Sequence, residues 1–269
     1  MIRNLFLYTR LVIIQIRSQA MFKTSLIMDI LSTSFFGLTE IFGFLLVIGQ
    51  LGDVAGWSTW EIAFLGATVE FSFGCMDMIF SGFDPDYFAP SIRRGDLDML
   101  LLRPIPLTIQ VLGSRFVLRR LGRILTGMLV LAIAFSHLSI NWSMGKVAYY
   151  ILIIISQIVL LGSFFIFGST ITFWTIERIE AVNIVTYGGR EVMTYPMEVF
   201  PRWLRHVFMF ILPFLFLNYS PALFIFEKTD PFQLPPFSPF LAPVIAAVFL
   251  LAALTFWRFG RRFYQSTGN

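Results

Sequence analysis

The stretch ISQIVLLGSFFIFG, residues 155–168, decides the class of fold. It carries no charge and lies within a longer apolar run, Val147 to Thr175. A helix of about 20 apolar residues is long enough to cross the hydrocarbon core of a membrane. The whole chain has the same bias: 57% of its 269 residues are hydrophobic and 13% are charged, where a soluble domain has about 25% charged residues. We therefore predict an all-α membrane protein, and we exclude a soluble enzyme and a nucleic-acid-binding protein.

Apolar runs and basic residues together predict six transmembrane helices with both termini in the cytoplasm. Most of the 20 basic residues lie in the N-terminal arm, between the second and third runs, and in the C-terminal tail. Basic residues favour cytoplasmic segments, so these three lie on one side and the number of crossings is even. The sixth crossing, or a re-entrant element, must come from residues 177–226. The other five crossings are Leu26–Leu51, Trp60–Phe80, a run that starts after Arg115 and ends near His137, Val147–Thr175 and Phe240–Trp257.

The first residues, 1–24, are predicted to form an interfacial helix. Arg3, Arg10 and Arg17 recur every seven residues, which places them in one stripe on a helix. Arginines in such a stripe can reach lipid headgroups while the apolar side chains face the membrane. A signal peptide would need an unbroken apolar stretch and a cleavage site of small residues, and neither is clear in this segment.

The segment FDPDYFAPSIRRGDLDMLLLRPIP, residues 83–106, follows the second predicted crossing. Its prolines at 85 and 90 are expected to break any helix before Ser91, which is a plausible N-cap. Pro104 and Pro106 are expected to end the helix that follows. Residues 84–106 therefore predict one short amphipathic helix on the cytoplasmic side, able to lie on the membrane or to dock into the groove of a soluble partner.

Residues 196–226 form the second unusual segment, in which proline recurs among aromatic residues. Non-helical backbone at membrane depth is tolerated only where protein buries it or water reaches it. Broken helices there indicate a gate or lid, and the alternative is one ordinary helix with a kink at Pro213. The prolines are Pro196, Pro201, Pro213 and Pro221.

Acidic residues inside the predicted crossings are candidates for a polar pathway. Glu40 lies in the first crossing, and Glu70 and Asp77 share one face of the second. Charged groups at membrane depth are costly and usually face a bundle interior, a cavity or a partner. If they carry ions, the chain is an ion-coupled secondary transporter or a channel. The alternative is that these carboxylates pair within the protein or lie near the headgroups.

At the two unusual segments the chain resembles the permease subunits of type-2 ABC exporters. The coupling-helix motif of that family, G-x-[LI]-[DE]-x-x-L-x-[RK]-P, reads here as Gly95, Leu97, Asp98, Leu101, Arg103 and Pro104. The family's P-x-x-x-x-P-x-W-L element, followed by an apolar stretch with an internal proline, reads as Pro196, Pro201, Trp203, Leu204 and Pro213, and the stretch from Asn218 through Tyr219 to Pro221 and Ala222 is similar to one branch of the family.

The resemblance implies a fold and a set of partners. Six crossings are expected, with an N-terminal interfacial helix, a cytoplasmic coupling helix and a re-entrant element, residues 196–226, that gates the exit before the last crossing. The fifth crossing is then about 179–195, although the charges of Arg202 and Arg205 instead favour 207–226. The gate residues are Pro196, Pro201, Trp203, Pro213, Tyr219 and Pro221. The expected ATPase contacts are Arg93, Arg94, Asp96, Leu97, Asp98, Leu101 and Arg103.

The resemblance also implies that a separate subunit binds and hydrolyses ATP. The chain has no P-loop, because its only Gly-Lys pair, Gly145-Lys146, is followed by Val147 and not by the Ser or Thr that the motif requires. We therefore expect no cofactor in this chain, with ATP and Mg²⁺ bound to a separate ABC ATPase subunit. We also expect a second copy or a related permease as a partner, contact with membrane lipid, and a location in a bacterial inner membrane. The substrate would be an amphipathic drug, a peptide or a lipid-like molecule.

Overall fold

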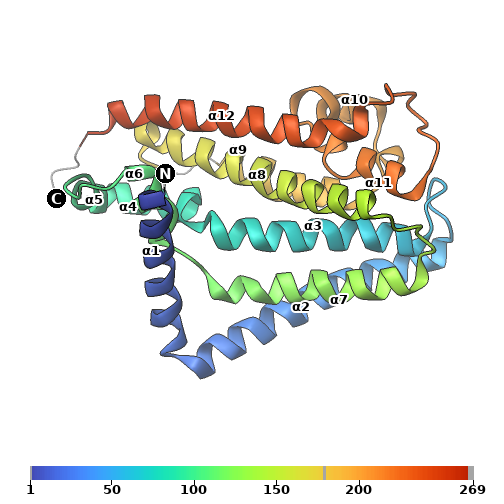
Figure 1. Cartoon of the computed structure of the whole chain (residues 1–269), viewed down its shortest axis with the longest axis horizontal. Helices are drawn as coiled ribbons and strands as arrows, with labels where there is room; N and C mark the ends of the chain where they lie inside the picture. Colours follow the sequence, from blue (N-terminus) through green and yellow to red (C-terminus); the bar gives the residue numbers. More distant parts are fainter. Residues whose placement is uncertain (1, 178–179, 266–269) are drawn as a thin grey trace.

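The computed structural model describes residues 2–177 and 180–265 (Figure 1). No β-strand occurs in these residues, and the apolar runs of the sequence form long helices. The α-helices are α1 (Ile2–Ala20), α2 (Lys23–Leu51), α3 (Thr59–Ile79), α4 (Pro85–Arg93), α5 (Asp96–Leu101), α6 (Leu107–Ser114), α7 (Leu121–His137), α8 (Met144–Thr175), α9 (Glu180–Thr194), α10 (Arg202–His206), α11 (Tyr219–Phe226) and α12 (Ala242–Gly260).

The long helices run side by side in one bundle (Figure 1). The helix α7 packs along α3, α12 packs along α8, and α9 contacts both α3 and α8. Four stretches are long and apolar enough to cross a membrane: Lys23–Val47, Thr59–Ile79, Met144–Thr175 and Ser238–Phe263. The bent pair Arg202–Ile211 and Phe214–Phe226 could supply a fifth. The shorter α7 has 17 residues and α9 has 15.

Glycines allow α7 to approach its neighbours closely. A Cβ atom on Gly127 would lie 2.7 Å from the backbone nitrogen of Phe71 in α3. A Cβ atom on Gly122 would lie 2.7 Å from the carbonyl oxygen of Ile30 in α2. Small residues are the usual means by which transmembrane helices bring their backbones together. The helix α7 is therefore wedged between α2 and α3, and no larger residue fits at either glycine without a shift.

The two ends of the bundle differ in their architecture (Figure 1). The helix α1 stands across one end, where α4, α5, α6 and the C-terminal end of α12 also lie. We call this the inner end, because it gathers both termini and the basic segments. The helices α10 and α11 lie at the opposite end, which we call the outer end.

The segment between α3 and α7 differs from its sequence-based prediction. Pro85 does not break a helix but begins α4, whose N-cap is Asp84, and Ser91 lies inside α4. Proline is favoured at the first helical position, because its missing N–H needs no partner there. Gly95 adopts a left-handed conformation, with φ of 73°, and separates α4 from α5. The prediction of one amphipathic helix capped by Ser91 is therefore wrong, since the segment folds into two short helices.

Candidate functional site

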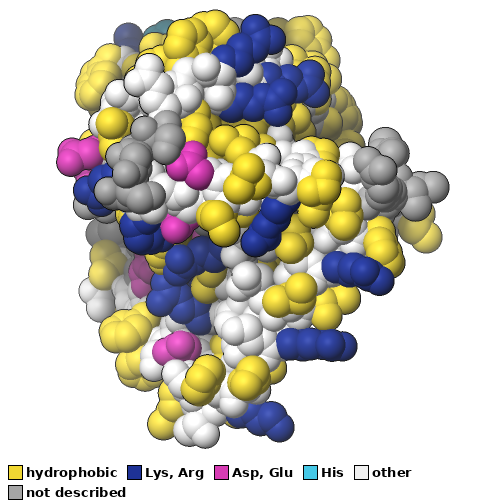
Figure 2. All heavy atoms as spheres, turned by 90° about the vertical axis from the view of Figure 1, so that its left-hand side faces the viewer, with side chains coloured by type: hydrophobic (Ala, Val, Ile, Leu, Met, Phe, Trp, Pro, Cys, Tyr) yellow, Lys and Arg dark blue, Asp and Glu magenta, His cyan; other side chains and the backbone are white. Residues whose placement is uncertain are grey.

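The first candidate site is the exposed surface of α4 and α5 at the inner end. Figure 2 shows this end of the molecule, where basic side chains predominate over acidic ones and apolar side chains lie between them. Arg93, Arg94, Asp96 and Arg103 are exposed, as the sequence analysis expected for a contact surface. Arg94 and Asp96 form an exposed ion pair, with Nη2 and Oδ2 2.9 Å apart. This edge therefore offers both charges and apolar groups to a partner.

The apolar part of this surface differs from the expectation. Leu97 is only 1% exposed and packs within its own chain, so it is not available to a partner. Leu101 is exposed, and Met99 and Leu102 are exposed beside it. Helical periodicity alone would place Leu97 and Leu101 on one face, because they are four residues apart. The difference follows their positions along α5, since Leu97 lies in its first turn and Leu101 is its last residue. The expectation that Leu97 packs against the ATPase is therefore wrong. Its side chain instead anchors α5 to the rest of the chain.

The segment is firmly attached to the last long helix. Trp257 of α12 packs against Phe83 and Phe88, with ring centroids 5.0 and 5.5 Å apart. Its indole nitrogen also donates a hydrogen bond to the hydroxyl of Thr108 at 3.0 Å. Trp257 is fully buried. Trp257 therefore joins both α4 and α6 to α12.

A second attachment involves one of the predicted contact residues. The Tyr264 hydroxyl donates a hydrogen bond to Oδ1 of Asp98 at 2.9 Å. Burial, together with the neighbouring Asp98, raises the pKa of Tyr264 to about 12. The hydroxyl therefore remains a donor throughout the physiological pH range. The sequence analysis assigned Asp98 only to a partner contact and gave Tyr264 no role.

The candidate pathway acids meet arginines inside the bundle. Arg190 of α9 lies 3.0 Å from Glu70 of α3 and 2.9 Å from Glu40 of α2. Arg123 of α7 lies 3.9 Å from Glu70. Glu70 is buried and Glu40 is half exposed. These four side chains form an ionic cluster that joins α2, α3, α7 and α9, and Arg190 is a residue that the sequence analysis did not select.

Asp77 belongs to a separate ion pair nearer the inner end. Its Oδ2 lies 2.8 Å from Nε of Arg120, just before α7, and the carboxylate is buried. The structure therefore brings Glu40 and Glu70 together but keeps Asp77 with its own arginine. A cavity of about 300 Å³ adjoins both groups, with Glu40, Glu70, Arg119, Arg120 and Arg123 among its lining residues.

The second candidate site is the outer element, residues 196–226. The π-helix Val207–Ile211 ends just before Pro213, and the chain bends by 76° between Arg202–Ile211 and Phe214–Phe226. The break at Pro213 is therefore sharper than a kink in one ordinary helix, and the bent pair can be either a broken crossing or a re-entrant element. Pro196 and Pro201 precede short helices, and Pro221 is buried in α11. Trp203 is largely exposed at the outer end.

Glu198 attaches this element to the loop before α3. Its Oε1 accepts hydrogen bonds from the Tyr219 hydroxyl at 2.5 Å and from the indole nitrogen of Trp57 at 3.3 Å. Lys228 adds an ion pair with Glu61 at 2.7 Å. The predicted gate residue Tyr219 is therefore joined through Glu198 to Trp57, in the loop before α3.

A buried amide holds the base of the outer element. Asn218 donates hydrogen bonds to the carbonyl oxygens of Leu65 at 3.2 Å and Met193 at 2.7 Å. It also accepts one from Gln157 at 3.1 Å. Buried amides of this kind specify one arrangement, because each broken bond leaves a polar group unpaired. Asn218 therefore joins α3, α8 and α9 at one point. In the sequence analysis Asn218 appeared only as part of the stretch that is similar to one branch of the family, and it had no assigned role.

Metal chemistry has no visible basis in the part of the chain that the structure describes. No group of three or more His, Cys, Asp and Glu side chains is arranged there to hold a metal ion. The first candidate site is the exposed surface of α4 and α5 with Leu102 and Arg103, which we call the docking edge. The second is the bent, hydrogen-bonded element at the opposite end. Both sites lie on a bundle of membrane-length helices, which defines a multi-pass membrane protein.

Comparison with known families identifies the family. A model described as ABC-2 family transporter protein matches residues 34–268. The match covers most of the chain, so this protein belongs to the ABC-2 transporter family, and the resemblance to type-2 ABC permeases is confirmed. Searches of curated proteins and of solved structures found no match.

Proposed function

We propose that this chain is the membrane-spanning permease subunit of an ATP-driven exporter. In this proposal the chain crosses a bacterial inner membrane six times, with both termini in the cytoplasm. The family implies association with an ABC ATPase. ATP and Mg²⁺ bind that partner, and a second copy or a related permease completes the pathway. The cargo is an amphipathic or hydrophobic molecule, such as a drug, a peptide or a lipid-like compound.

The observation that carries the proposal is the attachment of α4 and α5 to α12. Arg94, Asp96 and Leu102 face outward from the inner end, while Trp257 and Tyr264 hold the segment from beneath. A push from a partner on α5 therefore moves α12, and α8 beside it, as one unit. This is the mechanical behaviour that a coupling helix needs.

The bend in the outer element supports its role as a gate. Arg202 and Arg205 lie in α10, at the end of the bundle opposite α1 (Figure 1). This position speaks against the charge-based assignment that kept both arginines inside and made 207–226 the fifth crossing. In our proposal α9 is the fifth crossing and 196–226 re-enters from the outer side. Of the predicted crossing 179–195, Ile179 lies outside the described residues.

The ionic cluster disfavours the alternative of an ion-coupled transporter. A carboxylate that carries a proton must lose and regain its charge during the cycle. Arg190 lies 3.0 Å from Glu70 and 2.9 Å from Glu40, so both carboxylates are paired within the protein. The cluster therefore acts as a structural joint between helices.

A pulldown from native membranes in mild detergent tests the proposal. The tagged chain should recover an ABC ATPase in near-equal amount, and any related permease would appear beside it. Recovery of the chain alone, even after cross-linking, would refute the exporter proposal.

A matched pair of variants then tests the docking edge. Leu102→Asp places a charge on an apolar side chain that is 81% exposed at the inner end, and Met144→Asp does the same at 86% exposure at the outer end. Loss of one interface anchor costs more than about 1.4 kcal/mol, or tenfold in affinity. Leu102→Asp should therefore weaken ATPase recovery about tenfold, and Met144→Asp should leave it unchanged. Equal effects would contradict the assigned docking edge.

A further inference from the structure

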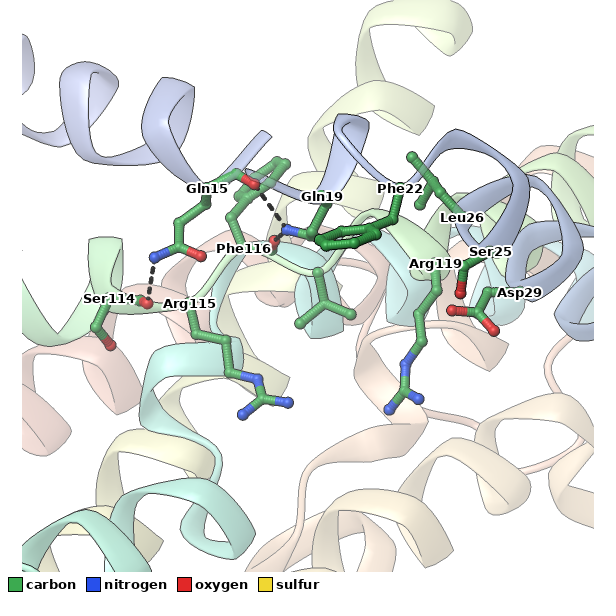
Figure 3. A pocket seen from close by; sticks show the side chains of 11 residues that line it. Gln15, Gln19, Phe22, Ser25, Leu26, Asp29, Ser114, Arg115, Phe116 and Arg119 are labelled. Carbon is green, nitrogen blue, oxygen red and sulfur yellow. Dashed lines mark hydrogen bonds between the residues drawn. The ribbon is translucent and has the colours of Figure 1, made fainter. Parts of the chain in front are cut away.

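A cavity of about 510 Å³ lies at the elbow between α1 and α2 (Figure 3). It is separate from the docking edge and from the outer element. Its third wall is the irregular segment between α6 and α7, which includes Arg115 and Arg119. A volume of this size lies within the range of about 300–1,000 Å³ that is usual for small-molecule sites. The cavity is therefore large enough for a polar ligand of moderate size.

Two arginines supply positive charge to this cavity, and one tyrosine positions both. The Cζ atom of Arg115 lies 3.3 Å from the centre of the Tyr87 ring. Nη2 of Arg119 donates a hydrogen bond to the Tyr87 hydroxyl at 3.3 Å. Neither guanidinium forms an ion pair with a carboxylate of residues 2–177 or 180–265. Both therefore retain donors for an anionic group.

The opposite wall supplies a single acidic group. Ser25 and Asp29 are four residues apart on α2, so they share one face of the helix. Both line the cavity, and Figure 3 shows their side-chain oxygens beside one another. The cavity thus carries two positive charges and one negative charge on separate walls.

The shape of the cavity is fixed by glutamines of α1. Gln15 donates a hydrogen bond to the carbonyl oxygen of Ser114 at 2.8 Å. Gln19 donates to the carbonyl oxygen of Phe116 at 2.5 Å and accepts from the backbone nitrogen of Leu118 at 2.9 Å. These bonds hold α1 against the arginine-bearing segment. The site is therefore formed before a ligand arrives.

The geometry points to a binding site for a phospholipid headgroup that carries both a phosphate and a primary ammonium. The phosphate contacts Arg115 and Arg119, and the ammonium contacts Asp29 and Ser25. The inference rests on the proposed topology, in which α1 lies at the membrane surface and the cavity opens at headgroup level. Arginine suits the phosphate, because its planar donors match phosphate oxygens.

The neighbouring surface suits the rest of a lipid molecule. Phe36 lies seven residues after Asp29, on the same face of α2, and is exposed. Phe22 and Leu26 line the cavity itself. An acyl chain can therefore continue along α2 from a headgroup seated at the elbow. A soluble phosphate ester would leave this apolar track unused.

Native mass spectrometry of the full-length chain, purified in detergent with any partner that remains bound, tests the inference. The probes are short-chain phosphatidylethanolamine, short-chain phosphatidylglycerol and inorganic phosphate. We expect one phosphatidylethanolamine per chain, weaker binding of phosphatidylglycerol and no displacement by inorganic phosphate. Hydrogen bonds to charged groups contribute about 1.5–3 kcal/mol, so Arg115→Gln with Arg119→Gln should weaken both lipids at least about tenfold.

Asp29→Asn separates the two headgroup contacts. It should remove the preference for phosphatidylethanolamine over phosphatidylglycerol while leaving phosphatidylglycerol bound. Arg261→Gln is the matched control, because Arg261 is exposed after α12 and does not line the cavity. If the double glutamine variant fails to fold, Arg115→Lys with Arg119→Lys keeps the charge and should retain at least part of the lipid binding.

Several results would overturn the inference. Equal losses in the Arg261 variant would indicate a general charge effect, and displacement by inorganic phosphate would indicate a site for soluble phosphate. An unchanged lipid preference in Asp29→Asn would remove the ammonium contact. Absence of retained lipid from wild-type protein would also refute the site. None of these readouts needs the ATPase, so failure here is distinct from failure of the exporter proposal.

Discussion

Tyr264, four residues beyond the end of α12, donates a hydrogen bond to Asp98 in α5 across 166 positions of sequence. The bond links the C-terminal segment to the helix that carries the docking edge. The Trp257 contacts add links from α12 to Phe88 in α4 and Thr108 in α6. A permease that must transmit motion from its inner end benefits from such a link.

Tyr264→Phe should uncouple α5 from the C-terminal segment. Loss of one hydrogen bond costs about 1 kcal/mol of stability, and we expect a clear fall in transport per ATP hydrolysed by the reconstituted complex. Tyr149→Phe is the control, because the Tyr149 hydroxyl donates a similar bond to the Pro239 carbonyl oxygen at 2.7 Å, away from the docking edge. The control should lose similar stability and keep its coupling. Normal coupling in the Tyr264 variant would contradict the mechanical role.

Arg190→Met should be strongly destabilising. The substitution leaves the buried Glu70 carboxylate without its nearest cation, and breaking a buried ion pair costs about 3–5 kcal/mol. Glu40→Gln should cost less than about 1 kcal/mol, because Glu40 is half exposed. Thermal unfolding in detergent measures both. Adding Glu70→Gln to Arg190→Met should recover part of the lost stability. If Arg190→Met unfolds at no lower temperature than Glu40→Gln, the cluster is not a structural joint.

Asp84 should make stability depend on pH. Burial, opposed by a hydrogen bond from the backbone of Asp86, raises the pKa of Asp84 from 3.8 to about 6. Between these values the folded protein holds a proton that the unfolded chain releases, so stability falls as pH rises through about 4 to 6. The loss is at most about 3 kcal/mol.

Asp84→Asn should abolish that dependence while keeping the N-cap of α4, since asparagine caps as well as aspartate. Unfolding midpoints of both proteins across this pH range provide the measurement. Asp53→Asn, at an exposed loop position, should retain the wild-type slope. An unaltered slope in Asp84→Asn would assign the effect to another group.

Gly127→Ala should separate α7 from α3. The added methyl group meets the Phe71 backbone at 2.7 Å, and overpacking typically costs about 1–3 kcal/mol. Gly43→Ala is the control, because nothing lies within 4 Å of its added methyl group. Alanine favours a helix by up to about 1 kcal/mol over glycine, so the control should be neutral or slightly stabilising. The order of the two unfolding midpoints tests the prediction directly.

The sequence predicted the long helices well because hydropathy is a local property. The expected run Trp60–Phe80 became Thr59–Ile79, and Val147–Thr175 became Met144–Thr175. The segment after α3 was predicted less well, since Pro85 begins a helix where a break was expected. The burial of Leu97 depends on how α5 sits on the bundle, which no local pattern contains. The count of six crossings remains a prediction.

Long-range pairing explains what the sequence could not predict at the candidate sites. Glu40 and Arg190 are 150 positions apart, and only the packing of α9 against α3 brings them together. The same holds for Asn218 and its acceptor on Leu65. The motif that predicted α5 as a coupling helix named Asp98 but carried no information about Tyr264. Side chains that join helices are therefore recognised only once the bundle is assembled.

The ionic cluster also bears on biosynthesis. Ribosomes add about 5–20 residues per second, so α2 with Glu40 emerges on the order of 10–30 seconds before Arg190 exists. The most extensive contacts of α2 are with α7, and its contacts with α1 and α3 are smaller. During that interval Glu40 lacks the arginine that pairs with it in the folded bundle. The joint between α2, α3 and α9 is therefore completed late, once α9 with Arg190 has been made.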